Sequence, residues 1–179
     1  VSESVVAAAR ANGQRILVGT SGWSADRLAD LNITDDESVT VIPNFSLGST
    51  VATHISGIVA KYFPEARIDE THNIAKVDAP SGTSVRTAEV IAADRCCAPT
   101  STEPAAGDHV VSGVPITSHR LPDAIAEQTV TFTGAGEMIT VSHETLSRDS
   151  YDDGIRAAVT YAASSTGLTV GLDTVMGIR

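Results

Sequence analysis

The chain has 179 residues, of which 42% are hydrophobic and 19% charged, and its formal net charge is −10. This composition is that of a globular protein with an ordinary core, and the length suits one large domain or one and a half modest ones. The acidic balance and the lack of any Lys/Arg run argue against a nucleic-acid-binding or anionic-membrane-binding surface.

The sequence also limits where the protein works. No segment approaches the ~20 apolar residues of a membrane span, and no signal peptide is visible. Cys96 and Cys97 are adjacent, which suits neither a disulfide nor a metal site, so they are interpreted as ordinary thiols in a reducing compartment. We therefore expect a cytoplasmic protein. Because the chain starts at Val1 within an expected helix, we also expect a segment upstream.

The first part of the chain alternates between helices and strands. A helix should end at Asn12-Gly13, and Ser24 should cap a second one. This order is typical of a doubly wound α/β sheet, in which ligands bind beyond the carboxyl ends of the strands. The expected elements are helices over 3–12 and 24–31 and strands over 15–19 and 38–42, followed by turns at 19–22 and 42–45.

The pattern changes after Ser46. An amphipathic helix over 47–63 is expected to bury an apolar stripe in the core, formed by Val51, Ile55, Ile58, Val59 and Phe63. The remaining expected elements are strands over 67–72, 114–121, 125–132, 138–143 and 168–172, helices over 82–94 and 151–164, and a flexible loop over 96–112. The chain is thus predicted to be α/β with two domains: residues 1–45, rejoined by the tail at 166–179, and a mixed sheet with helices over 46–165.

One loop carries most of the chemistry. His72, at a strand end, is a candidate proton donor because imidazole titrates near neutral pH. Lys76 adds a positive charge that can pair with a carboxylate. Residues 80–83 predict a helix start, where Gly82 and Thr83 offer backbone N–H groups that favour anions. The combination suits a small anionic substrate that is protonated as it reacts.

Each of these residues also has a plainer interpretation. His72 could be a packing or surface histidine, Lys76 a solvated lysine, and residues 81–83 a capping turn without a ligand. The other histidines lack metal-ligand spacing and are interpreted as structural, so no metal site is expected; they are His54, His109, His119 and His143.

The loop resembles that of the dihydrodipicolinate reductase family, the 4-hydroxy-tetrahydrodipicolinate reductases of lysine and diaminopimelate biosynthesis. Residues 76–83 read KVDAPSGT, similar to the family signature K-x-D-A-P-S-G-T, and the supporting blocks lie at 18–23, 43–46 and 143–148. The resemblance covers nearly the whole chain. It departs in two places: the family's second histidine is Asn73 here, and the family's opening strand and Gly-rich phosphate loop do not occur in this sequence.

The resemblance implies reduction of 4-hydroxy-tetrahydrodipicolinate to tetrahydrodipicolinate by NADH or NADPH. It implies a partial Rossmann-like parallel sheet, over 1–45 with the tail, and a mixed-sheet domain for substrate binding and homotetramer formation. The implied catalytic residues are His72 and Lys76, and the implied substrate-binding residues are Asn73, Gly82, Thr83 and Arg148. The implied cofactor contacts are Gly19, Thr20, Ser21, Ile42, Pro43, Asn44 and Phe45, although Gly19 and Pro43 would also suit ordinary strand-end turns.

Two other functions remain open on the sequence. The missing phosphate loop and Asn73 would also fit a non-catalytic relative or an assembly module without cofactor binding. A semialdehyde dehydrogenase would need a catalytic cysteine after a strand, and Cys96 and Cys97, at a helix end before a loop, do not suit that role. The upstream sequence separates the first alternative from the enzyme, which needs a strand followed by a Gly-rich turn.

Overall fold

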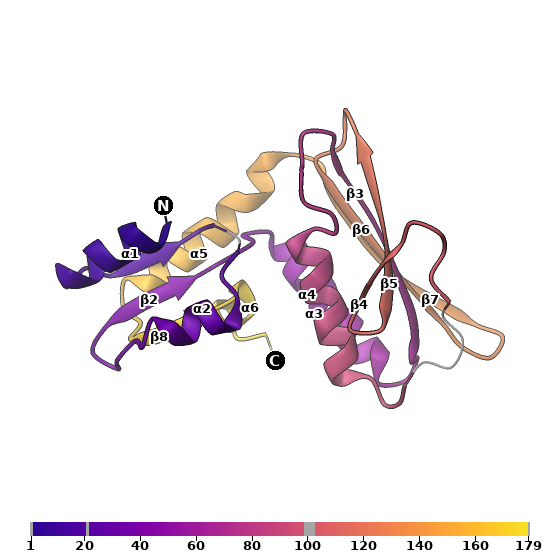
Figure 1. Ribbon diagram of the computed structural model, residues 1–179, viewed down its shortest axis with the longest axis horizontal. Coiled ribbons are helices and arrows are strands. Elements are labelled where there is room, and N and C mark those ends of the chain that lie inside the picture. Colours follow the sequence, from indigo (N-terminus) through magenta and orange to yellow (C-terminus); the bar gives the residue numbers. More distant parts are fainter. Residues whose placement is uncertain (1, 21, 99–102, 179) are drawn as a thin grey trace. The chain divides into compact units, whose positions relative to one another are not determined.

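The computed structural model describes residues 2–20, 22–98 and 103–178, and it divides into two compact units (Figure 1). Unit 1 comprises Val1–Leu47 and Asp149–Arg179, and unit 2 comprises Gly48–Arg148. Unit 1 holds a three-stranded sheet and unit 2 a five-stranded sheet, each accompanied by helices, so the expected α/β class is confirmed. In the described part of the chain, no helix is both long and apolar enough to cross a membrane.

Unit 1 is built on a parallel sheet with the strand order β1-β2-β8. The central strand is buried along its whole length, as expected for a strand covered on both faces. Val39 and Val41 of this strand form a core with Val6, Ile16 and Val18. The strands are β1 (Ile16–Val18), β2 (Ser38–Val41) and β8 (Gly167–Val170), and the helices are α1 (Ser2–Ala11), α2 (Ala25–Asp30), α5 (Asp152–Ala162) and α6 (Leu172–Met176).

Helix α5 lies in unit 1, whereas the sequence led us to expect it in the second domain. A Cβ atom added at Gly154 would lie 1.9 Å from the carbonyl oxygen of Phe45, so this helix packs directly on the backbone that follows β2. Ala158 joins Ile42 and Leu172 in a second core of unit 1. The helical pattern over 151–164 indicates that a helix forms, but it does not indicate which sheet the helix covers. The boundary between the units therefore lies between Arg148 and Asp149.

Unit 2 is built on a mixed sheet with the strand order β4-β5-β3-β6-β7. Strands β3 and β5 pair in parallel, and the other neighbours pair antiparallel. Helices α3 (Leu47–Ala60) and α4 (Gly82–Asp94) cover one face of this sheet (Figure 1), where Ile68, Ile91 and Phe132 are fully buried. The strands are β3 (Glu65–Asn73), β4 (His109–Val111), β5 (Val114–Leu121), β6 (Ala126–Thr133) and β7 (Met138–Thr145), and the 3-10 turn η1 (Arg148–Tyr151) follows.

The apolar stripe of α3 is only partly in the core, which corrects the expectation from its periodicity. Val51, Ile55 and Ile58 are 41–45% exposed, while Val59 and Phe63 pack against the core. The buried face of α3 consists of small residues, among them Gly57, where an added Cβ atom would lie 2.8 Å from Val90 of α4. Close approach of α3 to α4 thus selects small side chains for the contact face and turns three large ones outward.

Two short elements were not expected. The loop over 96–112 contains strand β4, which pairs with β5, and residues 99–102 of that loop lie outside the described part. The final strand ends at Val170, and Gly171 precedes the short helix α6 where the sequence suggested a strand up to residue 172. Neither element has a long enough periodic pattern to be predicted from the sequence.

Candidate functional site

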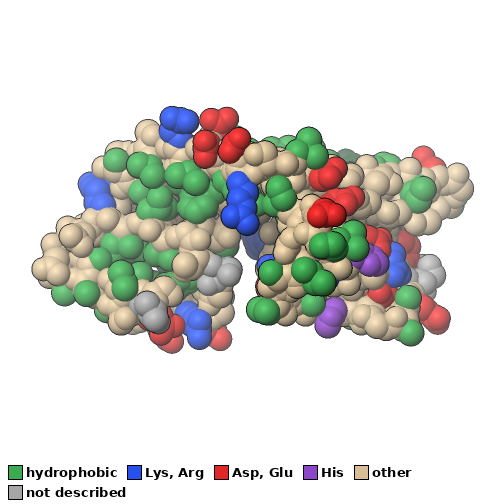
Figure 2. Space-filling view, turned by 90° about the horizontal axis from the view of Figure 1, so that it is seen from above, with side chains coloured by type: hydrophobic (Ala, Val, Ile, Leu, Met, Phe, Trp, Pro, Cys, Tyr) green, Lys and Arg blue, Asp and Glu red, His purple; other side chains and the backbone are tan. Residues whose placement is uncertain are grey.

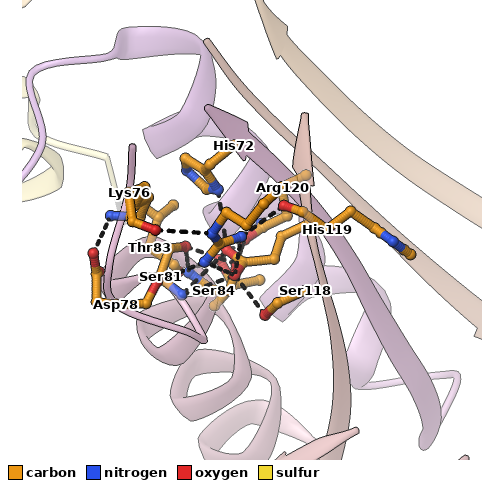
Figure 3. A network of polar contacts seen from close by, with 12 residues as sticks. His72, Lys76, Asp78, Ser81, Thr83, Ser84, Ser118, His119 and Arg120 are labelled. Carbon is orange, nitrogen blue, oxygen red and sulfur yellow. Dashed lines mark hydrogen bonds and ion pairs between the residues drawn. The ribbon is translucent and has the colours of Figure 1, made fainter. Parts of the chain in front are cut away.

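The candidate site lies where β3 ends, at the loop over 74–80 and the first turn of α4 (Figure 3). Local sequence explains its shape. The side chain of Asn73 accepts a hydrogen bond from the N–H of Ala75 (3.0 Å), which turns the chain as β3 ends. Ser81 then caps α4 by accepting a hydrogen bond from the N–H of Ser84 (3.2 Å), and the Ala79–Pro80 peptide bond before it is cis.

A fully buried carboxylate lies beneath this loop. Glu70 of β3 is 0% exposed and accepts hydrogen bonds from the Ser81 N–H (3.0 Å), the Ser84 hydroxyl (2.9 Å) and the Ser118 hydroxyl (2.6 Å). Arg120 of β5 pairs with it at 3.4 Å. Burial raises the pKa of Glu70, but the hydrogen bonds from the three serines outweigh burial and lower that pKa overall, so the group is ionised.

His72 lies two residues after Glu70 on the same strand and therefore on the same face. Its side chain is 14% exposed, and its Nδ1 atom lies 3.4 Å from Glu70 Oε2. Burial lowers the pKa of His72; the charge of Glu70 opposes this effect, and the charges of Lys76 and Arg120 add to it. The ring is consequently neutral at pH 7 in the free protein, and its protonated form is a stronger acid than an ordinary imidazolium.

Two cations converge on the loop. Lys76 Nζ lies 2.8 Å from Asp78 Oδ1, and the Lys76 side chain is 28% exposed. Arg120 donates to the backbone carbonyl oxygens of Lys76 (3.3 Å) and Asp78 (2.5 Å). Elsewhere, the face seen in Figure 2 shows Lys and Arg dispersed among acidic and apolar side chains. Two cations thus lie at the loop, and each is paired with a carboxylate, Lys76 with Asp78 and Arg120 with Glu70.

The first turn of α4 leaves room for a ligand. Among the 14 glycines, Gly82 alone combines a φ outside the left-handed region with no neighbouring atom within 4 Å of an added Cβ atom. The backbone conformation and the packing therefore do not require glycine here. Gly82 is exposed, and its N–H belongs to the helix N-terminus, where anions are favoured. His72, Lys76 and this turn together can hold an anion and deliver a proton to it.

The sequence model of the family described as "Dihydrodipicolinate reductase, C-terminus" matches residues 48–176, which is more than half of the chain. The chain belongs to the dihydrodipicolinate reductase family. The matched segment includes the whole of the loop and the first turn of α4, and it covers all five strands of unit 2.

Curated relatives support the family assignment. The chain is 41% identical over 182 residues to the 4-hydroxy-tetrahydrodipicolinate reductase of Clavibacter sepedonicus, covering 97% of this chain and 65% of the relative. It is 38% identical over 174 residues to the enzyme of the same name from Streptomyces griseus subsp. griseus, covering 90% and 70%. The chain thus spans somewhat less than two thirds of the length of the Clavibacter relative.

A solved structure of this family has the same fold. It is the dipicolinate-bound dihydrodipicolinate reductase from Paenisporosarcina sp. TG-14, which is 31% identical to this chain, with a TM-score of 0.69. The match covers 88% of this chain and 63% of that one.

In unit 1 the two blocks that resemble cofactor contacts of the dihydrodipicolinate reductases come together at the carboxyl ends of β1 and β2. The Ile42 N–H donates to the carbonyl oxygen of Val18 (2.8 Å), and a Cβ atom at Gly19 would lie 2.9 Å from the ring of Phe45. Gly19 and Pro43 are exposed at this edge, and the carboxyl ends of parallel strands are where α/β sheets bind ligands. The side chain of Ile42 is fully buried, which leaves only its backbone for such a contact.

The remaining cofactor predictions concern residues beside this edge. Thr20 is exposed and accepts a hydrogen bond from the Trp23 indole (3.2 Å). Asn44 accepts one from the N–H of Ser46 (3.0 Å), which fixes the turn after β2. Ser21 lies outside the described residues. These residues stay predictions as cofactor contacts.

Two of the predicted substrate-binding residues, Asn73 and Arg148, are not seen to face the same space as His72 and Lys76. Asn73 uses both ends of its amide within the protein, since it also donates to the carbonyl oxygen of Pro122 (2.7 Å). Arg148 is exposed in η1, and no contact found among the described residues joins it to His72 or Lys76. Both stay predictions as substrate-binding residues.

Sequence reasoning gave Ser81 a capping role but assigned no role to Glu70, Arg120, Ser84 or Ser118. The alternation of β3 places Ala66, Ile68 and Glu70 on the core face, so a charge at the third position was a usable signal. Arg120 lies on the corresponding face of β5, two residues after Ser118. A charged residue that alternates with buried apolar residues requires a partner of opposite charge. Here Glu70 of β3 and Arg120 of β5 are partners of each other.

Proposed function

We propose that the protein containing this chain reduces 4-hydroxy-tetrahydrodipicolinate to tetrahydrodipicolinate with NADH or NADPH. The observation that carries the proposal is the convergence of His72, Lys76 and the open first turn of α4 on one loop of unit 2 (Figure 3). Membership of the family and the dipicolinate in the related structure support a ring that bears two carboxylates as its ligand.

In this proposal the chain's own residues bind the ring and supply a proton. One carboxylate meets the N–H of Gly82 and the first turn of α4, which carries the positive end of the helix dipole. The other shares the Lys76 ammonium with Asp78. Two negative charges beside His72 favour its charged form, so substrate binding loads the imidazole with the proton that it donates.

The cofactor would lie at the edge of unit 1 formed by Gly19, Thr20 and residues 43–45. When bound, the nicotinamide supplies the hydride for the reaction. Gly19 and the Phe45 ring, which already pack against each other, would form the wall for the nicotinamide ring. Because the chain spans 65% of the Clavibacter relative, the remaining contacts are expected from a Gly-rich segment outside this sequence.

The proposal includes a homotetramer joined through the sheet of unit 2. Helices α3 and α4 cover one face of that sheet, and strand alternation sends Leu121, Thr129 and Met138 to the other. Leu121 and Met138 are 54% and 65% exposed, which favours burial against another copy of the same surface. Light scattering of the complete protein tests this: the expected mass is four times that of one chain, and a monomer contradicts it.

Turnover of the complete protein tests the reaction. We expect oxidation of NADH or NADPH that depends on 4-hydroxy-tetrahydrodipicolinate and is inhibited by dipicolinate. A protein that binds dipicolinate but oxidises neither nucleotide in the presence of the substrate contradicts the proposed activity. A protein that neither binds dipicolinate nor oxidises nucleotide contradicts the assigned substrate class as well.

A further inference from the structure

Two charged side chains beneath the loop have no role in the proposed reaction so far. Glu70 is fully buried, and the side chain of Arg120 is 19% exposed. A buried carboxylate lowers stability unless it is paired and hydrogen-bonded, and replacing such a pair by apolar residues is often neutral or stabilising. The position of this pair therefore calls for a reason other than stability.

Glu70 contacts two of the three groups that form the proposed site, His72 and the start of α4, and reaches the third, Lys76, only through Arg120. Its Oε1 and Oε2 atoms accept from the N–H of Ser81, the residue that caps α4, at 3.0 and 3.2 Å. The same carboxylate pairs with Arg120, which holds the loop that carries Lys76, and it lies 3.4 Å from His72 Nδ1. One carboxylate on the rigid sheet thus touches the imidazole, the loop anchor and the helix start.

The neighbourhood of His72 Nδ1 determines which ring nitrogen carries the proton. This atom is buried and has no hydrogen-bond partner among the described residues, while Glu70 Oε2 lies 3.4 Å away. An ionised carboxylate only accepts hydrogen bonds, so it favours the tautomer with the proton on Nδ1. Nε2 is then the nitrogen left to exchange a proton with a ligand.

Arg120 ties the loop backbone to the sheet. One terminal nitrogen donates to the carbonyl oxygen of Asp78 and to Glu70, and Nε donates to the carbonyl oxygen of Lys76. The planar guanidinium makes these contacts in fixed directions, which the single ammonium of a lysine cannot reproduce. Two backbone points, at Lys76 and at the second residue after it, are thereby fixed relative to Glu70.

We propose that Glu70 and Arg120 are positioning residues: Glu70 fixes the His72 ring through Nδ1 so that Nε2 delivers the proton, and Arg120 fixes the loop that presents Lys76. This inference rests on the proposed function. In the proton-transfer step the Nε2–H bond breaks and a C–H bond forms on the substrate, next to the carbon that takes hydride. The ring is left neutral, with its remaining proton on Nδ1 facing Glu70.

Nitrogen-15 NMR of the His72 ring in Glu70→Gln and Arg120→Gln tests the first half. Removing the negative charge should lower the pKa of His72 by about one unit and abolish the preference for the Nδ1–H tautomer. Removing the positive charge of Arg120 should raise the pKa. Simple loosening of the fold would admit water and raise the pKa in both variants, so a rise in Glu70→Gln overturns the proposal.

Steady-state kinetics of Arg120→Lys test the second half. This variant keeps the charge but loses the fixed contacts, so we expect an unchanged pKa of His72 together with an increase of about tenfold or more in the KM for the substrate. Arg86→Lys, on the exposed face of α4, is the matched control and should retain parent kinetics. An unchanged KM and kcat in Arg120→Lys would overturn the role of Arg120. If Glu70→Gln does not fold, the kinetics of Arg120→Lys alone test the proposal.

The two proposals fail in different ways. A protein without reductase activity whose His72 still responds to Glu70→Gln and Arg120→Gln in opposite directions contradicts the proposed function and leaves the positioning of the ring intact. An active enzyme whose His72 pKa moves upward in both variants contradicts the positioning alone.

Discussion

Glu37 of unit 1 and Glu70 of unit 2 are both carboxylates paired with an arginine, but their surroundings differ. The Glu37 side chain is 25% exposed, and Arg10 Nε lies 2.7 Å from it. Its other hydrogen bonds come from the N–H and hydroxyl of Thr34, three residues away, so the pair joins α1 to the turn before β2. Glu70 is fully buried and connects β3 with β5, α4 and the loop.

Glu37 stabilises the fold, whereas Glu70 contacts residues that are candidates for binding and catalysis. The hydrogen bonds and the ion pair of Glu37 stabilise a turn, which any protein with this turn could use, and the Glu37 side chain is partly exposed to water. Glu70 is removed from water and surrounded by groups that can bind or protonate a ligand. A buried charge is informative because keeping it there costs stability that a simpler core would not require.

The largest expected loss of activity comes from replacing His72, which lies beside Glu70. In the complete protein, His72→Asn should lower kcat by about 10²–10⁴-fold because general acid catalysis is lost. Steady-state kinetics measure this. His109→Asn is the matched control, since His109 is exposed on the edge strand β4 and has no role in the proposed site or in the proposed sheet contact. Comparable activity in the two variants would remove the proton donor from the account.

Gly82→Ala is expected to have the next largest effect. The added methyl group meets no atom of the protein but fills the space over the first turn of α4, so dipicolinate should bind about tenfold more weakly or worse. Thermal unfolding should be unchanged or slightly improved, by ~0.5 kcal/mol, because alanine restricts the unfolded chain. Calorimetry measures both. Unchanged affinity would place the carboxylate elsewhere.

Dipicolinate affinity should also depend on pH through His72. The pKa of His72 lies below its ordinary value in the free protein, and two added negative charges raise it in the complex. Binding therefore takes up a proton, and affinity should rise as the pH falls from neutral toward the free-protein pKa, by up to about tenfold per unit. Titration calorimetry in buffers of different ionisation enthalpy detects the proton; a pH-independent affinity would contradict the coupling.

The smallest effect concerns Glu37. Arg10 lowers the pKa of Glu37 to about 2, so the stabilisation is fully present above the ordinary value and is lost as the pH falls toward 2. Glu37→Gln should flatten this part of the stability profile of unit 1 without changing dipicolinate affinity. Trp23, the single tryptophan, packs on the unit 1 core and reports its unfolding. Weaker dipicolinate binding in Glu37→Gln would contradict the purely structural role of Glu37.

Much of the fold and part of the site could be predicted from the sequence. Strand and helix periodicities identified the main elements, and the loop from His72 to Thr83 carries a recognisable order of residues. The packing of α5 in unit 1 could not be predicted because the contact of Gly154 with Phe45 joins residues far apart in the chain. Arg120 escaped notice for the same reason: it is 50 residues from Glu70 and reaches it only through the parallel pairing of β3 with β5.

Titration of the isotope-labelled protein with dipicolinate, followed by NMR, tests the convergence of the three groups most directly. We predict saturable shifts of the Gly82 and Thr83 amides, the Lys76 side chain and the His72 ring, all with one dissociation constant. Two results would contradict a single dicarboxylate site in unit 2: the signals of these four residues do not shift while others do, or the shifts at His72 and at Gly82 follow different dissociation constants.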